Sequence, residues 1–288
     1  MSTSPTRGGA VGPGTLYVVA TPIGNLGDLS PRAAEVLRRV AAVAAEDTRR
    51  TLKLYAHLGA RPPRLVSLPA FAERERLAPL LARLRAGQEL ALVTDAGTPA
   101  VSDPGQALVE AAWEAGARVV PVPGPSAALA ALSASGLGTD RFLVTGFLPR
   151  AGKARAEALA WLKAVPATLV IFEAGNRLAE TLRELAAALG DRQAALAREL
   201  TKLHEEIVRG RLSELSGRFA GEVRGEVTLV VSGAAEAPRP EEAEPLDDEL
   251  RRRLQAGEAP AEVARRVARA RGLKRREVYA RLEALKRG

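Results

Sequence analysis

The stretch that decides the fold runs from Leu90 to Gly105 and reads LALVTDAGTPAVSDPG. Its apolar start, Leu90–Thr94, predicts a buried strand. The eleven residues that follow, Asp95–Gly105, contain two Gly, two Pro and two Asp together with Thr and Ser. An ordinary turn between a strand and a helix needs one Gly or one Asp, so this composition indicates a loop that approaches a ligand closely.

Three further loops have a similar character. Ala20–Asp28 (ATPIGNLGD) and Pro123–Ala127 (PGPSA) each follow a predicted strand, and Ala197–Glu206 (ARELTKLHEE) gathers charges and hydroxyls after another. In an open α/β sheet, ligands bind beyond the carboxyl ends of the strands. We therefore expect these loops to carry the functional site.

Outward from these loops, the first half of the chain alternates apolar runs with helical patterns. Strands are predicted at Leu16–Ala20, Ala41–Ala45, Leu65–Leu68, Leu90–Thr94 and Val119–Val122. Helices are predicted at Pro31–Val40 (with Ser30 as its cap), Thr48–Leu58, Glu73–Ala86, Gln106–Ala115 and Ala127–Ser135. This alternation predicts a mainly parallel sheet covered on both faces.

A break near Phe147–Lys153 precedes a second region of mixed pattern. Helices are predicted there at Ala154–Ala164, Arg177–Leu189 and Ser213–Phe219, and strands at Thr168–Phe172, Ala194–Ala197 and Glu226–Val231. We divide the chain into a disordered lead-in (1–13), an N-terminal α/β domain (14–147), a second α/β domain (148–233), a Pro- and Glu-rich linker (234–246) and a helical segment (247–288).

The positive charge is concentrated at the end of the chain. The 288 residues carry a formal charge of +8, and residues 249–288 alone contain 13 Lys or Arg and 5 Asp or Glu. Three short helices are predicted there, at Asp247–Leu254, Pro260–Ala270 and Lys274–Lys286, and the last two resemble a helix-turn-helix. A compact basic segment is typical of a protein that binds a polyanion, here nucleic acid.

Composition excludes several classes of protein and site. Without Cys, the chain has no disulfide, thiolate metal site or Cys nucleophile. No apolar run approaches the ~20 residues of a membrane span, and MSTSPTRGGAVGPG has no apolar signal region. We therefore expect a cytoplasmic protein without metal. Gly146–Lys153 imitates a phosphate-binding loop but has the wrong spacing.

The chain resembles the bacterial 16S rRNA (cytidine-2′-O)-methyltransferases of the tetrapyrrole methylase superfamily. The resemblance lies in the loops quoted above and in the segments LYVVATPIGNLGDLSPRAAEVL, AAEDTRRT, PVPGPSAALAALSASGL and FLPR. The resemblance implies two α/β domains of tetrapyrrole-methylase type, with S-adenosylmethionine in the cleft between them, and a small C-terminal helical segment. It also implies a homodimer and, as substrate, a cytidine ribose in the decoding region of 16S rRNA in the 30S subunit.

The resemblance also assigns candidate cofactor residues. They are Pro22, Gly24, Gly97, Thr98, Pro99, Val101, Ser102, Ser126, Ala127 and Phe172, with Leu200 and Thr228 as weaker assignments. A ribose hydroxyl is a weak nucleophile, so a general base would help the transfer. The candidate catalytic residues are Asp47, Asp103, Glu199 and Lys202.

Arginines are the candidate phosphate contacts because each offers a planar fork of donors. They are Arg49, Arg50, Arg177, Arg275, Arg276 and Arg281, and the last three are expected on the exposed side of the final helix. Aromatic residues make up only 3% of the chain. Tyr279 is the one obvious candidate for stacking on a base.

Two segments depart from the pattern of the family. Residues Pro69–Glu75 read PAFAERE where the family has a His-Glu-containing segment, and Glu173–Arg177 reads EAGNR where a Pro-His pair is usual. Both could line the substrate side. Two alternatives stay open: a methyltransferase that acts on a tetrapyrrole carbon, and a nucleic-acid-binding protein with an inactive α/β region.

Overall fold

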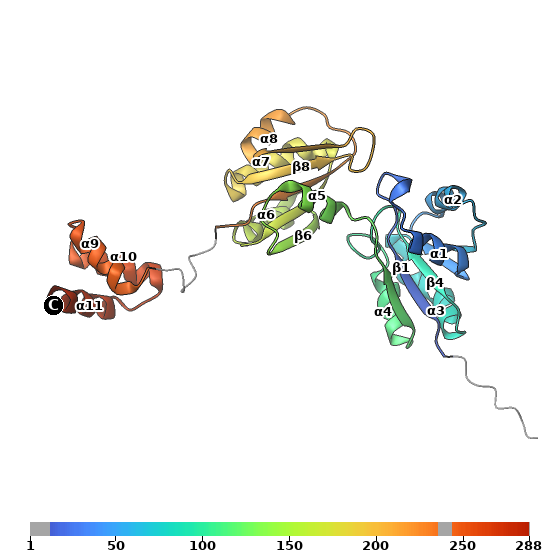
Figure 1. Cartoon of the computed structure of the whole chain (residues 1–288), viewed down its shortest axis with the longest axis horizontal. Coiled ribbons are helices and arrows are strands. Elements are labelled where there is room, and N and C mark those ends of the chain that lie inside the picture. The colour runs from blue at the N-terminus through green and yellow to red at the C-terminus, as the bar shows by residue number, and fades with distance from the viewer. Residues whose placement is uncertain (1–11, 236–243, 288) are drawn as a thin grey trace, which may run out of the picture. The chain divides into compact units, whose positions relative to one another are not determined.

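The computed structural model describes residues 12–235 and 244–287, which fall into two compact units that divide between Ala234 and Ala235 (Figure 1). Most of the lead-in expected over residues 1–13, and the middle of the linker expected over 234–246, lie outside the described residues. Among the described residues, no helix is both long and apolar enough to cross a membrane.

The first sheet of the larger unit is wholly parallel, as the alternation in the sequence predicts. Its strands are β1 (Thr15–Val19), β2 (Ala42–Ala45), β3 (Arg64–Ser67), β4 (Leu90–Val93) and β5 (Arg118–Val122). They lie in the order β3-β2-β4-β1-β5. Because all of them run the same way, their carboxyl ends meet at one edge of the sheet, and the first three quoted loops leave from that edge.

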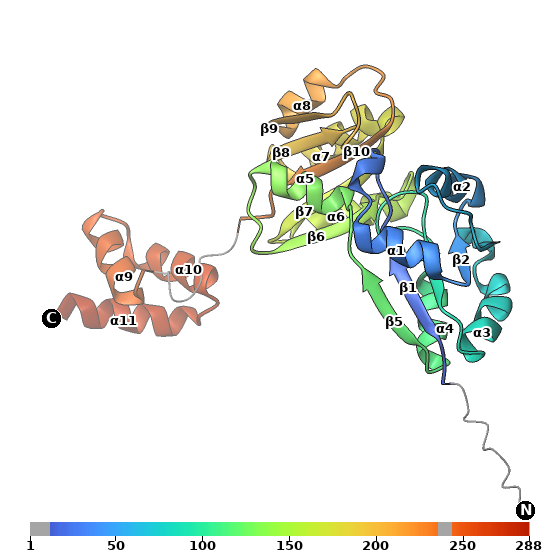
Figure 2. The same ribbon diagram turned by 45° about the vertical axis from the view of Figure 1, so that its right-hand side comes forward.

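Helices cover both faces of this sheet (Figure 2). They are α1 (Pro31–Arg39), α2 (Thr48–His57), α3 (Leu77–Arg85) and α4 (Gln106–Glu114). Leu16 of β1 packs in one apolar cluster with residues of α3 and α4, whereas its neighbour Tyr17 packs in another with residues of α1 and α2. Successive strand residues point to opposite faces, so one strand supplies both clusters.

Helix α3 begins at Leu77, not at Glu73 as predicted from the sequence. Residues 70–72 and 74–76 form two short 3₁₀ turns, η2 (Ala70–Ala72) and η3 (Arg74–Arg76). A helix from Glu73 would place Pro79 in its interior, where proline has no N–H to donate and clashes with the preceding turn. Starting at Leu77 puts Pro79 in the first turn instead, where proline is tolerated.

The second sheet is mixed and contains two strands that the sequence analysis missed. It consists of β6 (Phe142–Phe147), β7 (Thr168–Ala174), β8 (Gln193–Arg198), β9 (Glu206–Arg211) and β10 (Glu226–Val231), in the order β6-β7-β10-β8-β9. Only β6 and β7 are parallel. The second sheet therefore begins at Phe142, six residues before the boundary expected from the sequence, because Gly146 and a register shift obscure the pattern of β6.

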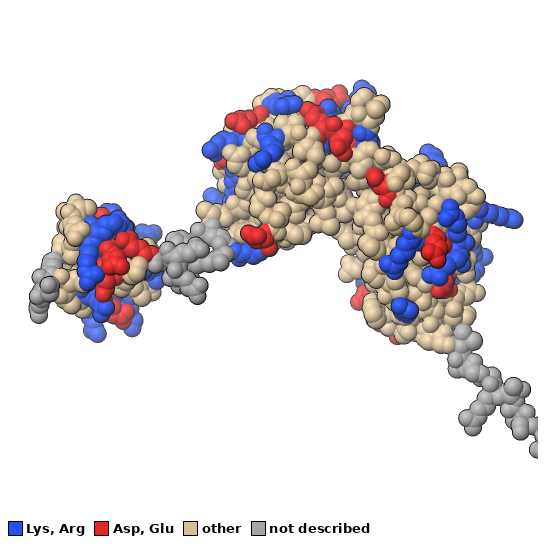
Figure 3. All heavy atoms as spheres, in the orientation of Figure 1, with Lys and Arg blue, Asp and Glu red and all other residues tan. Residues whose placement is uncertain are grey.

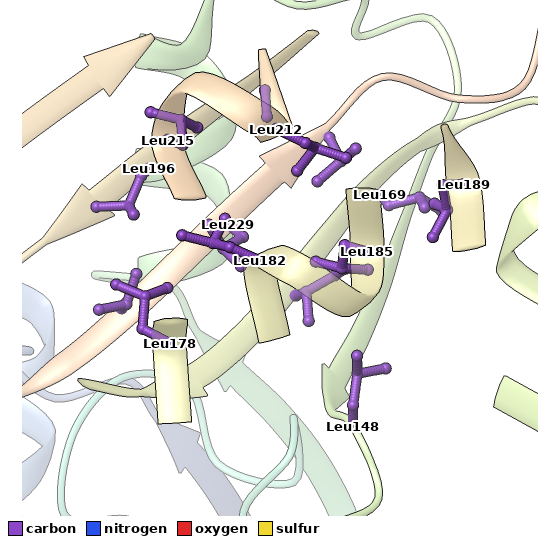
Figure 4. Close-up of a cluster of buried hydrophobic side chains, with 14 of the residues drawn as sticks. Leu148, Leu169, Leu178, Leu182, Leu185, Leu189, Leu196, Leu212, Leu215 and Leu229 are labelled. Carbon is purple, nitrogen blue, oxygen red and sulfur yellow. The ribbon is translucent and has the colours of Figure 1, made fainter. Parts of the chain in front are cut away.

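The core of the second sheet is rich in leucine (Figure 4). One face packs against α6 (Gly152–Lys163), α7 (Leu178–Leu189) and α8 (Leu212–Arg218), with Leu182 and Leu229 fully buried between them. The other face packs against α5 (Ala127–Ser135) through small residues such as Ala131. Helix α5 thus follows a loop of the first sheet and packs on the second, which ties the two sheets together.

The smaller unit is a bundle of three helices, as predicted. They are α9 (Leu246–Gln255), α10 (Pro260–Arg271) and α11 (Arg275–Arg287), with Gly272 in a left-handed conformation at the turn. Their shared core consists of Leu250, Val263, Ala264, Val267, Ala268, Val278 and Leu282. The bundle thus has a hydrophobic core of its own.

Candidate active site

All four loops singled out in the sequence line a single pocket of about 650 Å³ in the larger unit. The predicted cofactor residues among its lining are Pro22, Gly24, Gly97, Thr98, Val101, Ser102, Ser126, Ala127, Phe172, Leu200 and Thr228. Pro99 is not in the lining. The volume lies within the range of about 300–1,000 Å³ typical of small-molecule sites.

Backbone contacts join the loops of the first sheet to one another. Thr21 and Gly97 exchange two backbone hydrogen bonds, of 2.8 and 3.0 Å. The Thr98 hydroxyl donates to the carbonyl of Pro125 at 3.4 Å. The loops after β1, β4 and β5 therefore support one another, which fixes the pocket wall on this side.

The loop after β4 has a strained backbone. Ala100 and Ser102 have φ of 64° and 65°, in the left-handed region that residues with a Cβ rarely adopt. Ser102 packs against β6, because a Cβ added to Gly146 would lie 2.9 Å from its hydroxyl oxygen. Strain of this kind concentrates at functional sites, where the surrounding structure holds it in place.

The loop after β8 is strained in the same way. Glu199 and Thr201 have φ of 50° and 66°, and the Glu199 carboxylate pairs with Lys202 Nζ at 2.9 Å. A Cβ on Gly24 would lie 2.6 Å from Lys202 Cγ and 2.9 Å from the carbonyl oxygen of Leu200. Glycine at position 24 thus lets the loop after β1 approach the loop after β8 at the pocket.

Replacing Gly24 by Ala is expected to weaken cofactor binding, because the added methyl must displace the backbone at Leu200. Overpacking of this kind costs about 1–3 kcal/mol, and we expect the ligand-bound pocket to bear this cost, so the Kd for S-adenosylmethionine should rise about 5- to 150-fold. Calorimetric titration measures it. Gly221→Ala is the matched control, because nothing lies within 4 Å of a Cβ there. An unchanged Kd in the Gly24 variant would contradict this role.

Three carboxyl groups of the first half line the pocket together: Glu46, Asp95 and Asp103. Burial raises the pKa of Asp103 to about 6, and repulsion from Glu46, Asp95 and Glu226 adds to the shift. Burial also raises the pKa values of Glu46 and Asp95. A carboxylate with a pKa this close to neutrality is suited to accept a proton.

Two of these acids lock the ends of neighbouring strands. The backbone N–H of Asp95 donates to Glu46 Oε2 at 3.1 Å, and that of Asp47 donates to Asp95 Oδ1 at 3.1 Å. Arg50 pairs with Asp95 at 3.2 Å. Glu46 and Asp95 thus have structural partners, whereas the carboxyl of Asp103 makes no hydrogen bond or ion pair with another described residue.

Asp47 lies outside the pocket lining and caps helix α2. Its carboxylate accepts from the Arg49 backbone at 2.8 Å and from the Arg49 side chain at 2.7 Å. The Arg49 guanidinium lowers the pKa of Asp47 to about 2. A carboxylate stabilised in this way is a weak base, so the geometry favours Asp103 over Asp47.

Arg177 turns toward the interior. Its guanidinium lies 3.5 Å from the fully buried carboxylate of Glu173, which also accepts a hydrogen bond from Thr181 at 2.6 Å. Contact between Arg177 and a phosphate would require this pair to open.

The Gly that replaces the usual Pro in this segment has a local reason. The Gly175 backbone N–H donates to the carbonyl of Gly225 at 2.8 Å, which proline could not do. A Cβ at position 175 would also collide with the carbonyl oxygen of Val223. The glycine thus permits the close packing of this turn on the segment before β10.

Several pocket residues were not among the predicted ones. Glu46, Asp95, Phe147 and Glu226 all contribute to the lining, and Arg50, predicted only as a phosphate contact, lies there too. Glu46 and Arg50 stand in the quoted AAEDTRRT segment, directly after β2. Residues that follow a parallel strand lie at the ligand-binding edge of the sheet, so their place in the sequence could have predicted their place in the pocket. Phe147 and Glu226 come from β6 and β10, and their approach to the pocket depends on pairing between distant strands.

In the smaller unit, Arg275, Arg276 and Arg281 are exposed, as expected. Arg281 pairs with both carboxylate oxygens of Asp247 at 2.8 Å, whereas Arg275 and Arg276 have no ion pair within the described part of the chain. Figure 3 shows acidic and basic atoms side by side on this unit. Much of its formal positive charge is therefore neutralised locally.

The fold and this pocket define a methylase of the tetrapyrrole type. A family model described as tetrapyrrole (corrin/porphyrin) methylases matches residues 15–216. A uroporphyrin-III C-methyltransferase of Thermus thermophilus, solved with S-adenosyl homocysteine, has a similar fold, with a TM-score of 0.56 at 23% identity over 76% of this chain and 97% of that one.

Two relatives of high sequence identity identify the family within this class. Each is called ribosomal RNA small subunit methyltransferase I. The protein of Micromonospora olivasterospora is 50% identical over 273 residues, 93% of this chain and 86% of the relative. That of Synechocystis is 45% identical over 269 residues, 92% and 96%. The chain belongs to this family of ribosomal RNA small subunit methyltransferases.

Proposed function

We propose that the protein transfers a methyl group from S-adenosylmethionine to the ribose 2′-OH of a cytidine in the decoding region of 16S rRNA, on the 30S subunit. Its family membership supports the class of reaction and of substrate. The observation that carries the proposal is the pocket at which the loops of both sheets meet, with the carboxyl of Asp103 in its wall.

The pocket suits S-adenosylmethionine in size and charge. Phe147 and Phe172 line it with ring centroids 5.7 Å apart at 54°, which offers a purine an aromatic wall. Its carboxylates (Glu46, Asp95, Asp103, Glu199 and Glu226) outnumber its cations, Arg50 and Lys202. A negative site suits a ligand with a net charge of about +1, because its sulfonium and ammonium groups outnumber its one carboxylate. The predicted cofactor residues that line the pocket would hold it.

The chain's own residues would position the acceptor and remove its proton. Bound S-adenosylmethionine supplies a methyl group activated by its positive sulfur. Asp103 is the base we favour, because its carboxyl lines the pocket and makes no hydrogen bond or ion pair with another described residue. It would accept the 2′-OH proton as the ribose oxygen attacks the methyl group and S-adenosylhomocysteine leaves. Glu199 and Lys202 neutralise each other at 2.9 Å and would orient the acceptor. Holding the two reactants in line contributes several kcal/mol more.

Contacts with the RNA backbone would come from both units. Arg49 is largely exposed at the start of α2 and pairs with Asp47, whose N–H donates to the pocket residue Asp95. In the smaller unit, Arg275 and Arg276 are the candidates we favour over the paired Arg281.

We also propose that the protein is a homodimer and that it acts in the cytoplasm, the compartment of the ribosome. Equilibrium sedimentation tests the dimer.

Labelled S-adenosylmethionine tests this proposal directly. The protein is incubated in parallel with unmethylated 30S subunits and with a tetrapyrrole of the uroporphyrin III type, the class of substrate in the name of the T. thermophilus protein of similar fold. We expect label only in the 16S rRNA. Label in the tetrapyrrole would instead support the alternative carbon methylation, and no label in either would remove the proposed activity.

A further inference from the structure

The aromatic side chain most exposed among the described residues belongs to Phe71, which is 91% exposed. It lies in the short turn η2, within the segment that departs from the family's pattern. The chain holds only five Phe, so an aromatic ring left in water at this place is unusual. Single exposed apolar residues are common on protein surfaces, and the case for a function rests on what surrounds Phe71.

The segment around Phe71 is fixed beside the pocket at both of its ends. At one end, the Leu68 N–H donates to the carbonyl of Ala45, the residue before Glu46, at 2.7 Å. At the other, Glu73 Oε1 accepts the N–H groups of Gly105 and Leu108 at 3.1 and 3.2 Å. Gly105 follows Asp103 by two residues. Phe71 therefore lies in a turn whose two ends are hydrogen-bonded to residues close in sequence to Glu46 and Asp103, two acids that line the pocket.

Two exposed arginines accompany the ring, in a segment whose formal charge over residues 71–76 is zero because Glu73 and Glu75 balance them. Arg74 and Arg76 in η3 are exposed, and neither side chain makes an ion pair or hydrogen bond within the described residues. Arg49 and Arg50, which follow the adjacent strand β2, are paired with Asp47 and Asp95. Two unpaired guanidinium groups next to an exposed aromatic ring form a surface that complements a polyanion with planar bases.

We infer that Phe71 stacks on an unpaired base of the acceptor RNA next to the methylated nucleotide, while Arg74 and Arg76 contact its phosphates. The inference rests on the proposed function and adds the residues that present the substrate. RNA strands that are read outside a duplex stack on aromatic side chains, and cations beside the ring bind the backbone. The bases of such a strand offer the flat apolar partner that this ring lacks.

Steady-state kinetics with 30S subunits tests the inference. Phe71→Ala should raise the KM for subunits about 5- to 150-fold, the range for loss of one stacked base, with the Kd for S-adenosylmethionine unchanged. Phe71→Trp should restore the KM to within a few-fold. Trp113→Ala is the matched control, because Trp113 is an exposed aromatic residue, 63% accessible, at the far end of α4. It should behave as the parent.

A binding assay separates this inference from the proposed function. Filter binding of 16S rRNA in the presence of S-adenosylhomocysteine reports RNA affinity without methyl transfer. Weaker binding by Phe71→Ala would support the inference even if the parent transferred no methyl group. Unchanged binding and KM would overturn it, as would a shift to monomer in sedimentation, which would assign the ring to a second copy of the chain. If Phe71→Ala does not fold, the double variant Arg74→Ala/Arg76→Ala takes its place.

Discussion

Replacing Asp103 by Asn is expected to lower kcat about 10²- to 10⁴-fold, the usual contribution of a general base. Asn keeps the size of the side chain but cannot accept the proton of the ribose hydroxyl. Because the pocket loses little shape, the Kd for S-adenosylmethionine should change only a few-fold. Single-turnover methylation of 30S subunits measures the chemical step, and calorimetry measures the Kd.

The pH profile follows from the raised pKa of Asp103. Its deprotonated form is the active one, so the rate of the parent protein should rise with pH through about 6 and level off above. The Asn variant should lack this rise. A full rate in the variant, or a profile that still bends near pH 6, would assign the base to another residue.

The same pKa shift makes Asp103 costly to stability. The folded protein holds this proton more tightly than the unfolded chain, so stability should fall as the pH rises from about 4 to about 6 and stay level above. After discounting for its partial exposure, Asp103→Asn should stabilise the fold by about 1–2 kcal/mol at pH 7. Urea unfolding measures the difference.

Asp191 provides a control in which the pKa shift, and therefore its effect on stability, has the opposite sign. Its carboxylate accepts the Ser213 N–H at 2.9 Å, and this bond lowers its pKa. Asp191→Asn should therefore lose stability at neutral pH while methylation stays unchanged, because Asp191 does not line the pocket. If both variants lost stability, the assignment of Asp103 as a destabilised functional carboxylate would be wrong.

Removing residues 235–288 is expected to weaken binding to 30S subunits about 10- to 100-fold and to flatten its dependence on salt. Lys and Arg side chains that bind phosphates release counterions, so the slope of log K against log salt falls by about 1 for each such side chain removed. The deleted helices share a core of their own. Binding of S-adenosylmethionine to the remaining unit should therefore stay intact.

Point variants of the full chain locate the effect. Arg275→Ala/Arg276→Ala should reduce the salt slope by about 2, because both cations are free to meet phosphates. Arg281→Ala should change it less, since Asp247 already neutralises that charge. A truncated protein that binds and methylates subunits as well as the parent would show that this unit is not a substrate arm.

Local patterns were sufficient to predict much of this fold and its pocket loops. The parallel sheet follows from apolar runs that alternate with amphipathic helices, and β1 and α5 lie within a residue of their predicted bounds or match them. Composition alone singled out the loop at Asp95–Gly105. Those features depend on residues that are neighbours in the chain.

Features that depend on distant pairing escaped prediction. Strand β6 shifts its register against β7 between Val144 and Gly146. Strand β9 alternates half-buried and exposed residues at a sheet edge. Glu226 reaches the pocket only because β10 lies in the middle of the second sheet. The exposure of Phe71 depends on where Glu73 finds its backbone partners, which no local pattern specifies.

The most direct test of the proposed activity is to identify the nucleoside that the protein methylates. The 16S rRNA of 30S subunits, from a strain that lacks the corresponding enzyme, is digested after the reaction and analysed by mass spectrometry. We predict a single 2′-O-methylcytidine in the decoding region. A methyl group on a base, or on the ribose of another nucleotide, would contradict the proposal.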